Sequence, residues 1–143
     1  MAMKDVVMKN LIQAMKDKNV REKGVLQLLK SGLENAEKVK KAQLTEKEEF
    51  EVVQREIKQN KDFLVETEKL NRTDSIEDTK EKIEILYAYL PEQLTADEVK
   101  ATLVKLGIQK AMKKGEAMII AIPSLEGRTE KALISQIVDQ LIK

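Results

Sequence analysis

The stretch "EILYAYLPEQLTADEV", residues 84–99, decides how the chain is organised. Pro91 ends a helical pattern, because the residue before a proline is driven out of the helical region of backbone space. Four residues later, Thr95 and Glu98 form the S/T-x-x-E pattern of a capping box, which begins a new helix. The stretch therefore predicts a boundary between two helical domains.

Upstream of this boundary, residues 1–90 are predicted to form an N-terminal domain of about four helices, several of them long. Apolar residues recur there at spacings of three and four, which is the period of an amphipathic helix. A second capping box, Thr45 with Glu48, separates two of the helices. The expected ranges are 4–17, 20–43, 45–70 and a helix that ends at Pro91 and has Asp74 or Ser75 as its N-cap. Gly32 beside Ser31 is expected to let a neighbouring helix approach closely.

Downstream, residues 91–143 are predicted to form a small three-helix bundle. The helix that begins after Thr95 is expected to end at Gly107, a C′ residue. The segment 117–122, "AMIIAI", resembles a strand by composition. Because Gly115 precedes it and Pro123 follows it, we favour a short helix over 113–123 that Pro123 stops. The last helix is expected at 129–142.

Composition supports an all-α fold and excludes several kinds of site. The 143 residues are 42% hydrophobic, 36% charged and only 3% aromatic, with no Trp, so the core must consist of aliphatic side chains and Met. The chain has no Cys and no His. Disulfides, thiolate nucleophiles, Ser–His–Asp sites and Cys-based zinc sites are therefore excluded. We expect no metal, no cofactor and no catalytic residue.

The sequence also lacks the signals of a membrane or secreted protein. No apolar run approaches the roughly 18 residues of a membrane-spanning helix. The first residues, "MAMKDVVMKN", contain charges and no apolar core of a signal peptide. We therefore expect a cytoplasmic protein without membrane contact.

Charge is balanced over the whole chain but not along it. Residues 1–44 carry a net charge of +5, residues 45–90 carry −5, and residues 91–143 carry +1. A basic segment followed by an acidic one suggests two helical segments that pack together with compensating charge. A nucleic acid would have to bind a local basic patch.

The best candidate for such a patch flanks the short helix of the second domain. Lysines and arginines neutralise phosphates, and a backbone opened by glycine at a helix start presents N–H groups to them. The candidate nucleic-acid-binding residues are Lys110, Lys113, Lys114, Gly115, Gly127, Arg128 and Lys131. A three-helix bundle would allow the two clusters to lie near each other. The alternative is that these residues are ordinary solvated loop charges.

Other charged groups have simpler explanations. Lys38, Lys40 and Lys41 end the second predicted helix, where cations interact favourably with the helix dipole. The combinations of Glu and Lys that are candidates for acid–base chemistry lie at ordinary surface spacings; they are Lys80, Glu81 and Glu84, and Lys58 with Glu56. No pattern gathers either set into a pocket.

Two long segments of the chain resemble a known family. The segment "QREIKQNKDFLVETEKLNRTDSIEDTKEKIEILYAYLPEQLTADEV" is similar to the central block of the stand-alone YqeY-like proteins, and "KKGEAMIIAIPSLEGRTEKALISQIVDQLI" is similar to their closing block. The family shares its C-terminal region with the tail of GatB, the subunit of the tRNA-dependent amidotransferase that binds tRNA. The resemblance implies an N-terminal helical domain, a three-helix C-terminal domain of GatB/YqeY type, and a link to tRNA.

The resemblance also implies a label, that of carbon–nitrogen ligases with glutamine as amido-N donor. In the full amidotransferase, ammonia release uses a Ser–Ser–Lys site in another subunit, and transfer occurs in a GatB catalytic domain. Neither is visible in this sequence. We therefore expect a non-catalytic module that binds tRNA or associates with translation, with tRNA and translation-related proteins as partners. The alternative is a protein-interaction adaptor that uses the long helical hairpin and has no nucleic-acid role. The oligomeric state stays open.

Overall fold

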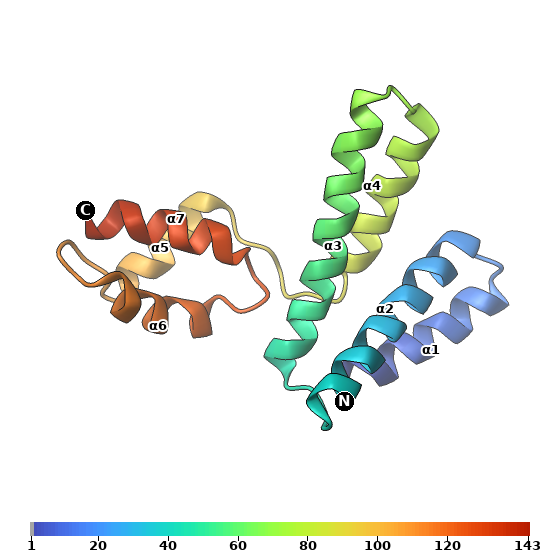
Figure 1. Ribbon diagram of the computed structural model, residues 1–143, viewed down its shortest axis with the longest axis horizontal. Helices are drawn as coiled ribbons and strands as arrows, with labels where there is room; N and C mark the ends of the chain where they lie inside the picture. The colour runs from blue at the N-terminus through green and yellow to red at the C-terminus, as the bar shows by residue number, and fades with distance from the viewer. Residues whose placement is uncertain (1) are drawn as a thin grey trace. The chain divides into compact units, whose positions relative to one another are not determined.

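The computed structural model describes residues 2–143, and its regular structure there consists of seven α-helices without a strand (Figure 1). The all-α prediction is confirmed. The helices are α1 (Met3–Lys16), α2 (Val20–Lys40), α3 (Glu46–Lys69), α4 (Thr73–Tyr87), α5 (Ala96–Lys105), α6 (Lys114–Ser124) and α7 (Lys131–Ile142). They divide into two compact units, one that ends at Leu90 and one that spans Pro91–Lys143. No helix among residues 2–143 combines the length and apolarity needed to cross a membrane.

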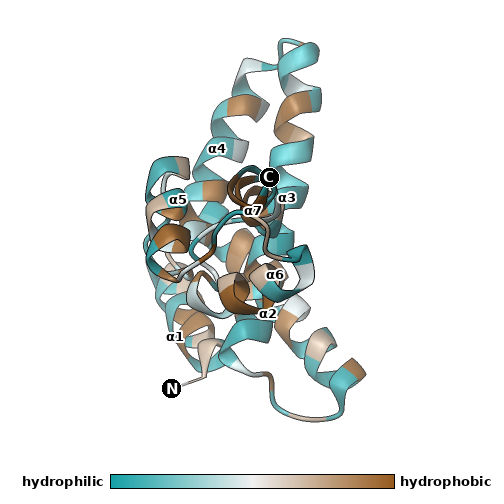
Figure 2. Cartoon of the chain, turned by 90° about the vertical axis from the view of Figure 1, so that its left-hand side faces the viewer, coloured by the Kyte–Doolittle hydropathy of each residue, from teal (hydrophilic) through white to brown (hydrophobic). Residues whose placement is uncertain are grey.

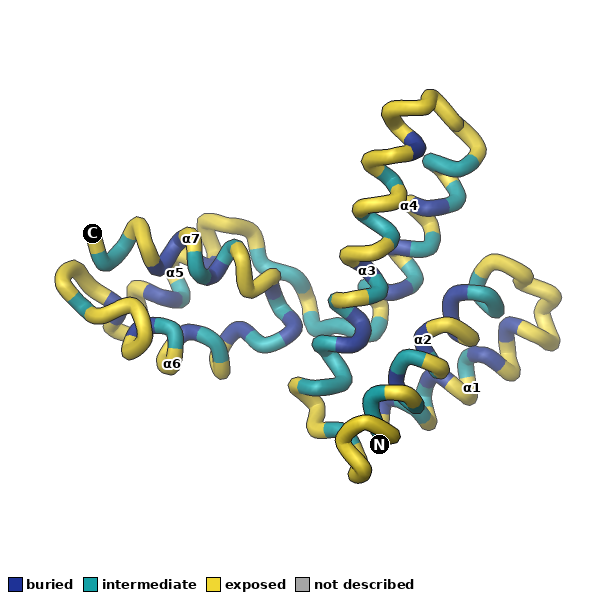
Figure 3. The backbone as a smooth tube through the Cα atoms, in the orientation of Figure 1, coloured by how far each residue is buried: buried dark blue, intermediate teal, exposed yellow. Residues whose placement is uncertain are grey.

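The N-terminal unit consists of two helical hairpins, α1 with α2 and α3 with α4 (Figure 1). Helix α2 joins them, because it contacts both α3 and α4. The core is aliphatic, as the composition requires, and its fully buried members include Leu26, Leu29, Leu33 and Val53. In Figure 3 the buried segments lie along the helices and the turns at the hairpin ends are exposed.

Helices α2 and α3 cross at Gly32, where the predicted close approach is confirmed. A Cβ at this position would lie 3.2 Å from Cγ1 of Val52 and 3.5 Å from Oε1 of Glu56. A larger residue at this position would therefore require the Val52 side chain to shift. The predicted capping box is present at the start of α3. The Thr45 hydroxyl accepts a hydrogen bond from the Glu48 N–H, and the Glu48 carboxylate accepts one from the Thr45 N–H.

The predicted start of α4 is wrong. Its N-cap is Arg72, not Asp74 or Ser75, and no side chain caps the helix. Asn71 adopts the left-handed conformation, with φ 52°, and completes the turn after α3 earlier than we expected. Asp74 thus lies in the first turn of α4, where its negative charge interacts favourably with the positive end of the helix dipole.

The end of α4 carries both tyrosines of the chain. The helix ends at Tyr87, and two further turn hydrogen bonds, from the N–H groups of Tyr89 and Leu90, carry the chain to Pro91. The Tyr89 hydroxyl accepts a hydrogen bond of 2.8 Å from Nδ2 of Asn10, which ties this end to α1. Lys61 Nζ lies 5.5 Å from the centre of the Tyr87 ring. Both tyrosines pack against the N-terminal core.

The C-terminal unit contains α5, α6 and α7, with α7 packed against both of the others. The predicted capping box of Thr95 and Glu98 starts α5, and Gly107 follows its end with φ 89°. The unit has a core of its own, in which Val99, Leu103, Leu125 and Val138 are fully buried. In Figure 2, α7 is largely brown, because apolar residues make up most of this helix.

Two boundaries in this unit differ from the prediction. Helix α6 contains Pro123 and ends one residue later, at Ser124. Pro123 lies in the last turn, where its missing N–H removes only a bond to the carbonyl group of Ile119. Helix α7 begins at Lys131 instead of residue 129.

Candidate nucleic-acid interface

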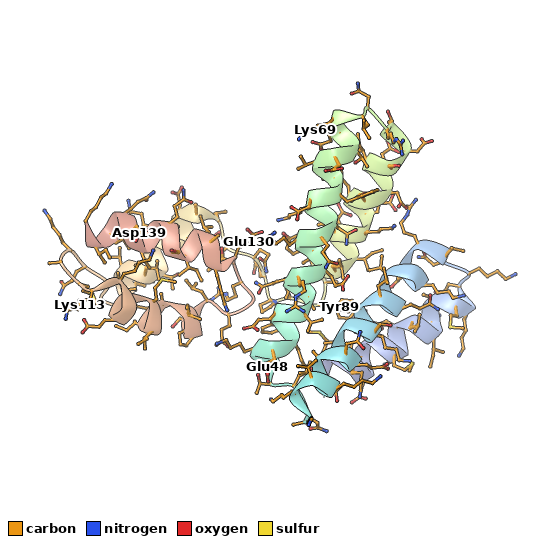
Figure 4. All side chains as sticks on the ribbon, in the orientation of Figure 1. Glu48, Lys69, Tyr89, Lys113, Glu130 and Asp139 are labelled. Atoms are coloured by element: carbon orange, nitrogen blue, oxygen red, sulfur yellow. The ribbon has the colours of Figure 1, made fainter. Side chains whose placement is uncertain are left out.

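The predicted basic residues lie at the two ends of α6. Lys110, Lys113, Lys114 and Gly115 precede or begin this helix, whereas Gly127, Arg128 and Lys131 follow it. An 11-residue helix is about 16 Å long, so the structure keeps the two clusters apart. In Figure 4, Lys113 and Asp139 lie toward one end of the C-terminal unit and Glu130 lies at the other. We call the first cluster the α6 start and the second the α6–α7 loop.

At the α6 start, the side chains of Lys110, Lys113 and Lys114 are all exposed. The N-cap residue Lys113 forms no side-chain hydrogen bond to the helix, so its side chain does not cap the first N–H groups of α6. A Cβ at Gly115 would meet nothing within 4 Å, so the backbone is open to a ligand. The positive end of the helix dipole and three lysines thus act on the same surface.

Two carboxylates reduce this positive charge. Lys114 Nζ lies 3.0 Å from Oδ1 of Asp139 on α7, and Glu116 lies in the first turn of α6. Lys110 and Lys113 are therefore the cations of this cluster that have the most freedom to meet a phosphate. The chain that carries them is held by a hydrogen bond of 3.1 Å from the Ala111 N–H to the Ile142 carbonyl group at the end of α7.

Two hydrogen bonds join the α6–α7 loop to the segment after Pro91. Gln93 Nε2 donates to the Gly127 carbonyl group at 2.6 Å, and the Leu94 N–H donates to the Arg128 carbonyl group at 2.9 Å. Gly127 is buried and has φ 72°, a conformation that glycine adopts without strain. Gly127 was predicted to contribute to a phosphate site, whereas the hydrogen bond from Gln93 to its carbonyl group was not predicted.

Arg128 is half-buried, and its charge acts on the α5 capping box. Hydrogen bonds from the backbone and the side chain of Thr95 lower the pKa of Glu98, and Arg128 lowers it further. Lys131 is exposed at the first position of α7. Gly127 and Arg128 therefore have structural roles in the α6–α7 loop, whereas, within the described part of the chain, the lysines Lys110 and Lys113 of the α6 start have none of this kind.

The other charged groups form ion pairs across the N-terminal unit. Lys40 pairs with Glu48 at 2.5 Å, and Lys41 adopts the left-handed conformation that ends α2. Arg21 on α2 pairs with both Asp78 and Glu81 on α4. These contacts join the basic and acidic segments, in keeping with the predicted charge compensation.

The residue combinations considered for catalysis do not meet in one place. Glu81 pairs with Arg21, Lys58 pairs with Asp62 at 3.5 Å on the surface of α3, and Lys80 and Glu84 are exposed on α4. Within residues 2–143, no group of three or more Asp and Glu residues has an arrangement suited to holding a metal ion.

Comparison with known proteins places the chain in a family. A search of curated proteins finds no match. The family model described as "Yqey-like protein" matches residues 4–142, which is nearly the whole chain. The chain therefore belongs to the YqeY-like family.

Proposed function

We propose that this protein is a non-catalytic module that binds tRNA, and that the α6 start makes the contact. The observation that carries the proposal is the coincidence of three exposed lysines with an uncapped, open helix N-terminus. Such a surface suits a phosphate group, which accepts hydrogen bonds from N–H groups and is neutralised by ammonium groups. The tRNA as ligand comes from the family resemblance.

Titration of labelled tRNA at several salt concentrations tests the proposal. We expect binding at about 50 mM salt that weakens linearly on a log–log plot, because each phosphate contact releases counterions. The variant K110E/K113E should reduce the negative slope by about 1.5 to 2. Lys114 stays unchanged in this variant because its pair with Asp139 holds α6 to α7.

The matched control is Lys9→Glu, an exposed charge reversal on α1. It should leave the slope and the affinity almost unchanged. Undetectable tRNA binding at low salt would contradict the proposal. An equal loss in K110E/K113E and in Lys9→Glu would contradict the assignment to the α6 start.

The second candidate function is a protein-interaction adaptor. Several large apolar side chains of the N-terminal helices are exposed; they include Val20, Leu28, Val39 and Phe63. Exposed apolar surface favours a protein partner over a polyanion. Retention of a protein partner after nuclease treatment would support this role.

Amidation supplies a separate test of the non-catalytic part of the proposal. The purified chain, given glutamine, ATP and misacylated tRNA, is expected to form no amidated tRNA. Formation of amidated tRNA by the chain alone would overturn this part and leave the tRNA contact intact.

A further inference from the structure

A cavity of about 440 Å³ lies in the N-terminal unit between α2, α3 and α4. Three rows of residues, each with the four-residue spacing of a helix face, line it. Helix α2 contributes Val20, Gly24 and Leu28, α3 contributes Glu56 and Asn60, and α4 contributes Asp78, Lys82 and Leu86. The cavity is therefore a groove whose walls are helix surfaces.

The wall formed by α2 exposes an apolar stripe. Val20 is 80% exposed and Leu28 is 65% exposed, although both line the groove. Gly24 lies midway between them, and a Cβ at this position would meet nothing within 4 Å. The stripe thus has one apolar side chain on each side of Gly24, where the missing side chain leaves a dip. Such a shape can receive a ridge of side chains from another helix.

The polar groups of the groove are paired, with one exception. Arg21 and Lys82 are the cations of the groove, and both pair with Asp78. Among residues 2–143, the half-buried carboxylate of Glu56 forms no hydrogen bond and no ion pair. Burial raises the pKa of Glu56, although the charge of Arg55 acts in the opposite direction. A carboxylate that is partly removed from water and has no partner favours a cationic ligand.

We propose that this groove binds an amphipathic helix of another protein, which directs a Lys or Arg side chain to Glu56 and apolar side chains to Val20 and Leu28. The stripe from Val20 to Leu28 is about 12 Å long, or roughly two helical turns. It therefore matches apolar anchors at i, i+3 or i+4, and i+7. A small amine would satisfy Glu56 but would leave Val20 and Leu28 in water. The proposal is independent of the tRNA contact and gives the adaptor role a defined site.

Selection from a display library of helical peptides tests the proposal directly. The library has peptides of roughly 14 residues, or four turns, with one helix face randomised, and the target is the full chain. We expect the enriched peptides to carry one Lys or Arg between apolar residues at helical spacing. Replacing this cation by Glu in a synthesised peptide should weaken binding at least about tenfold in an anisotropy titration.

Variants of the protein then locate the site. Gly24→Leu should fill the dip and weaken peptide binding at least about tenfold, whereas the matched control Gly24→Ala should change it less than about twofold. Leu28→Lys replaces an exposed apolar residue of the groove by a cation and should also weaken binding. Glu56→Gln should abolish the preference for a cationic over a neutral peptide. Circular dichroism checks that each variant folds.

The outcomes that overturn the proposal are distinct from a failure of the tRNA proposal. No enrichment, enriched peptides without a common cation, or equal binding to Gly24→Leu and Gly24→Ala would each overturn it. All of these variants should bind tRNA as the unaltered chain does, because they leave the α6 start unchanged.

Discussion

At the scale of single residues, the two glycines inside α2 have opposite surroundings. Gly24 faces open space, whereas a Cβ at Gly32 would lie 3.2 Å from Val52. Gly24→Ala should raise the free energy of unfolding by about 0.5–1 kcal/mol, since glycine is the poorer helix former. Gly32→Ala gains the same propensity but crowds the side chain of Val52, so its gain in stability should be smaller than that of Gly24→Ala. Urea denaturation measures both, and an equal gain in the two variants would contradict the close approach.

Glu48 gives a prediction about pH. The hydrogen bond from Lys40 and that from the Thr45 backbone lower the pKa of Glu48 from 4.5 to about 2. A carboxyl group whose pKa is lowered by folding stabilises the protein above its unfolded pKa, and this contribution is lost as the pH falls toward the folded pKa. Glu48→Gln should therefore lower the melting temperature at pH 7, and the difference should shrink below pH 4.5 and vanish near pH 2.

The control for Glu48 is Glu46→Gln in the same first turn of α3. Glu46 is exposed and has the same helix dipole beside it, but Glu48 has the pair with Lys40. The control should have the smaller effect at pH 7. A constant difference between Glu48→Gln and the unaltered chain from pH 7 to pH 2 would show that the charge of Glu48 is not its source.

At the scale of elements, helix starts were predictable where a side chain defines them. Both capping boxes, at Thr45 and Thr95, have the expected hydrogen bonds. The start of α4 was not predictable in this way, because a left-handed residue, Asn71, sets it and no side chain caps the helix. The end of α6 also differed from the prediction, because a proline in the last turn removes only one hydrogen bond of the helix.

The contribution of the N-cap to the stability of α5 can be tested by comparing Thr95, the N-cap, with Thr102 inside the helix. Thr95→Ala removes the hydroxyl that accepts the Glu98 N–H and should reduce the stability of the C-terminal unit by about 1 kcal/mol. Thr102 donates its hydroxyl to the Glu98 carbonyl group within the same helix. Thr102→Ala should be neutral or slightly stabilising, because alanine has the higher helix propensity. Similar losses in thermal denaturation of the two variants would contradict the capping role.

At the scale of the whole molecule, the basic cluster at the α6 start was predictable from the sequence, but the groove between α2, α3 and α4 was not. Lys110, Lys113 and Lys114 are close in the sequence, so their cluster was visible as a pattern. The groove combines residues of α2, α3 and α4, and its important property is an unpaired carboxylate, Glu56. Pairing depends on tertiary packing, and the pattern around Glu56 is that of an ordinary helix surface. The separation of the two basic clusters likewise depends on the intact helix α6 between them.

The two hydrophobic cores supply the last prediction. Leu29 is fully buried in the N-terminal core and Leu103 is fully buried in the C-terminal core, and the two cores share no residue. Replacing either leucine by alanine should reduce stability by about 2–5 kcal/mol, because a cavity remains. A unit of roughly 50 residues has little stability to lose, so Leu103→Ala should unfold the C-terminal unit. Amide hydrogen exchange on the full chain should then show lost protection in α5, α6 and α7 only. Leu29→Ala should instead weaken protection in α1 to α4, and equal loss across all seven helices in either variant would show that the chain unfolds as one cooperative unit.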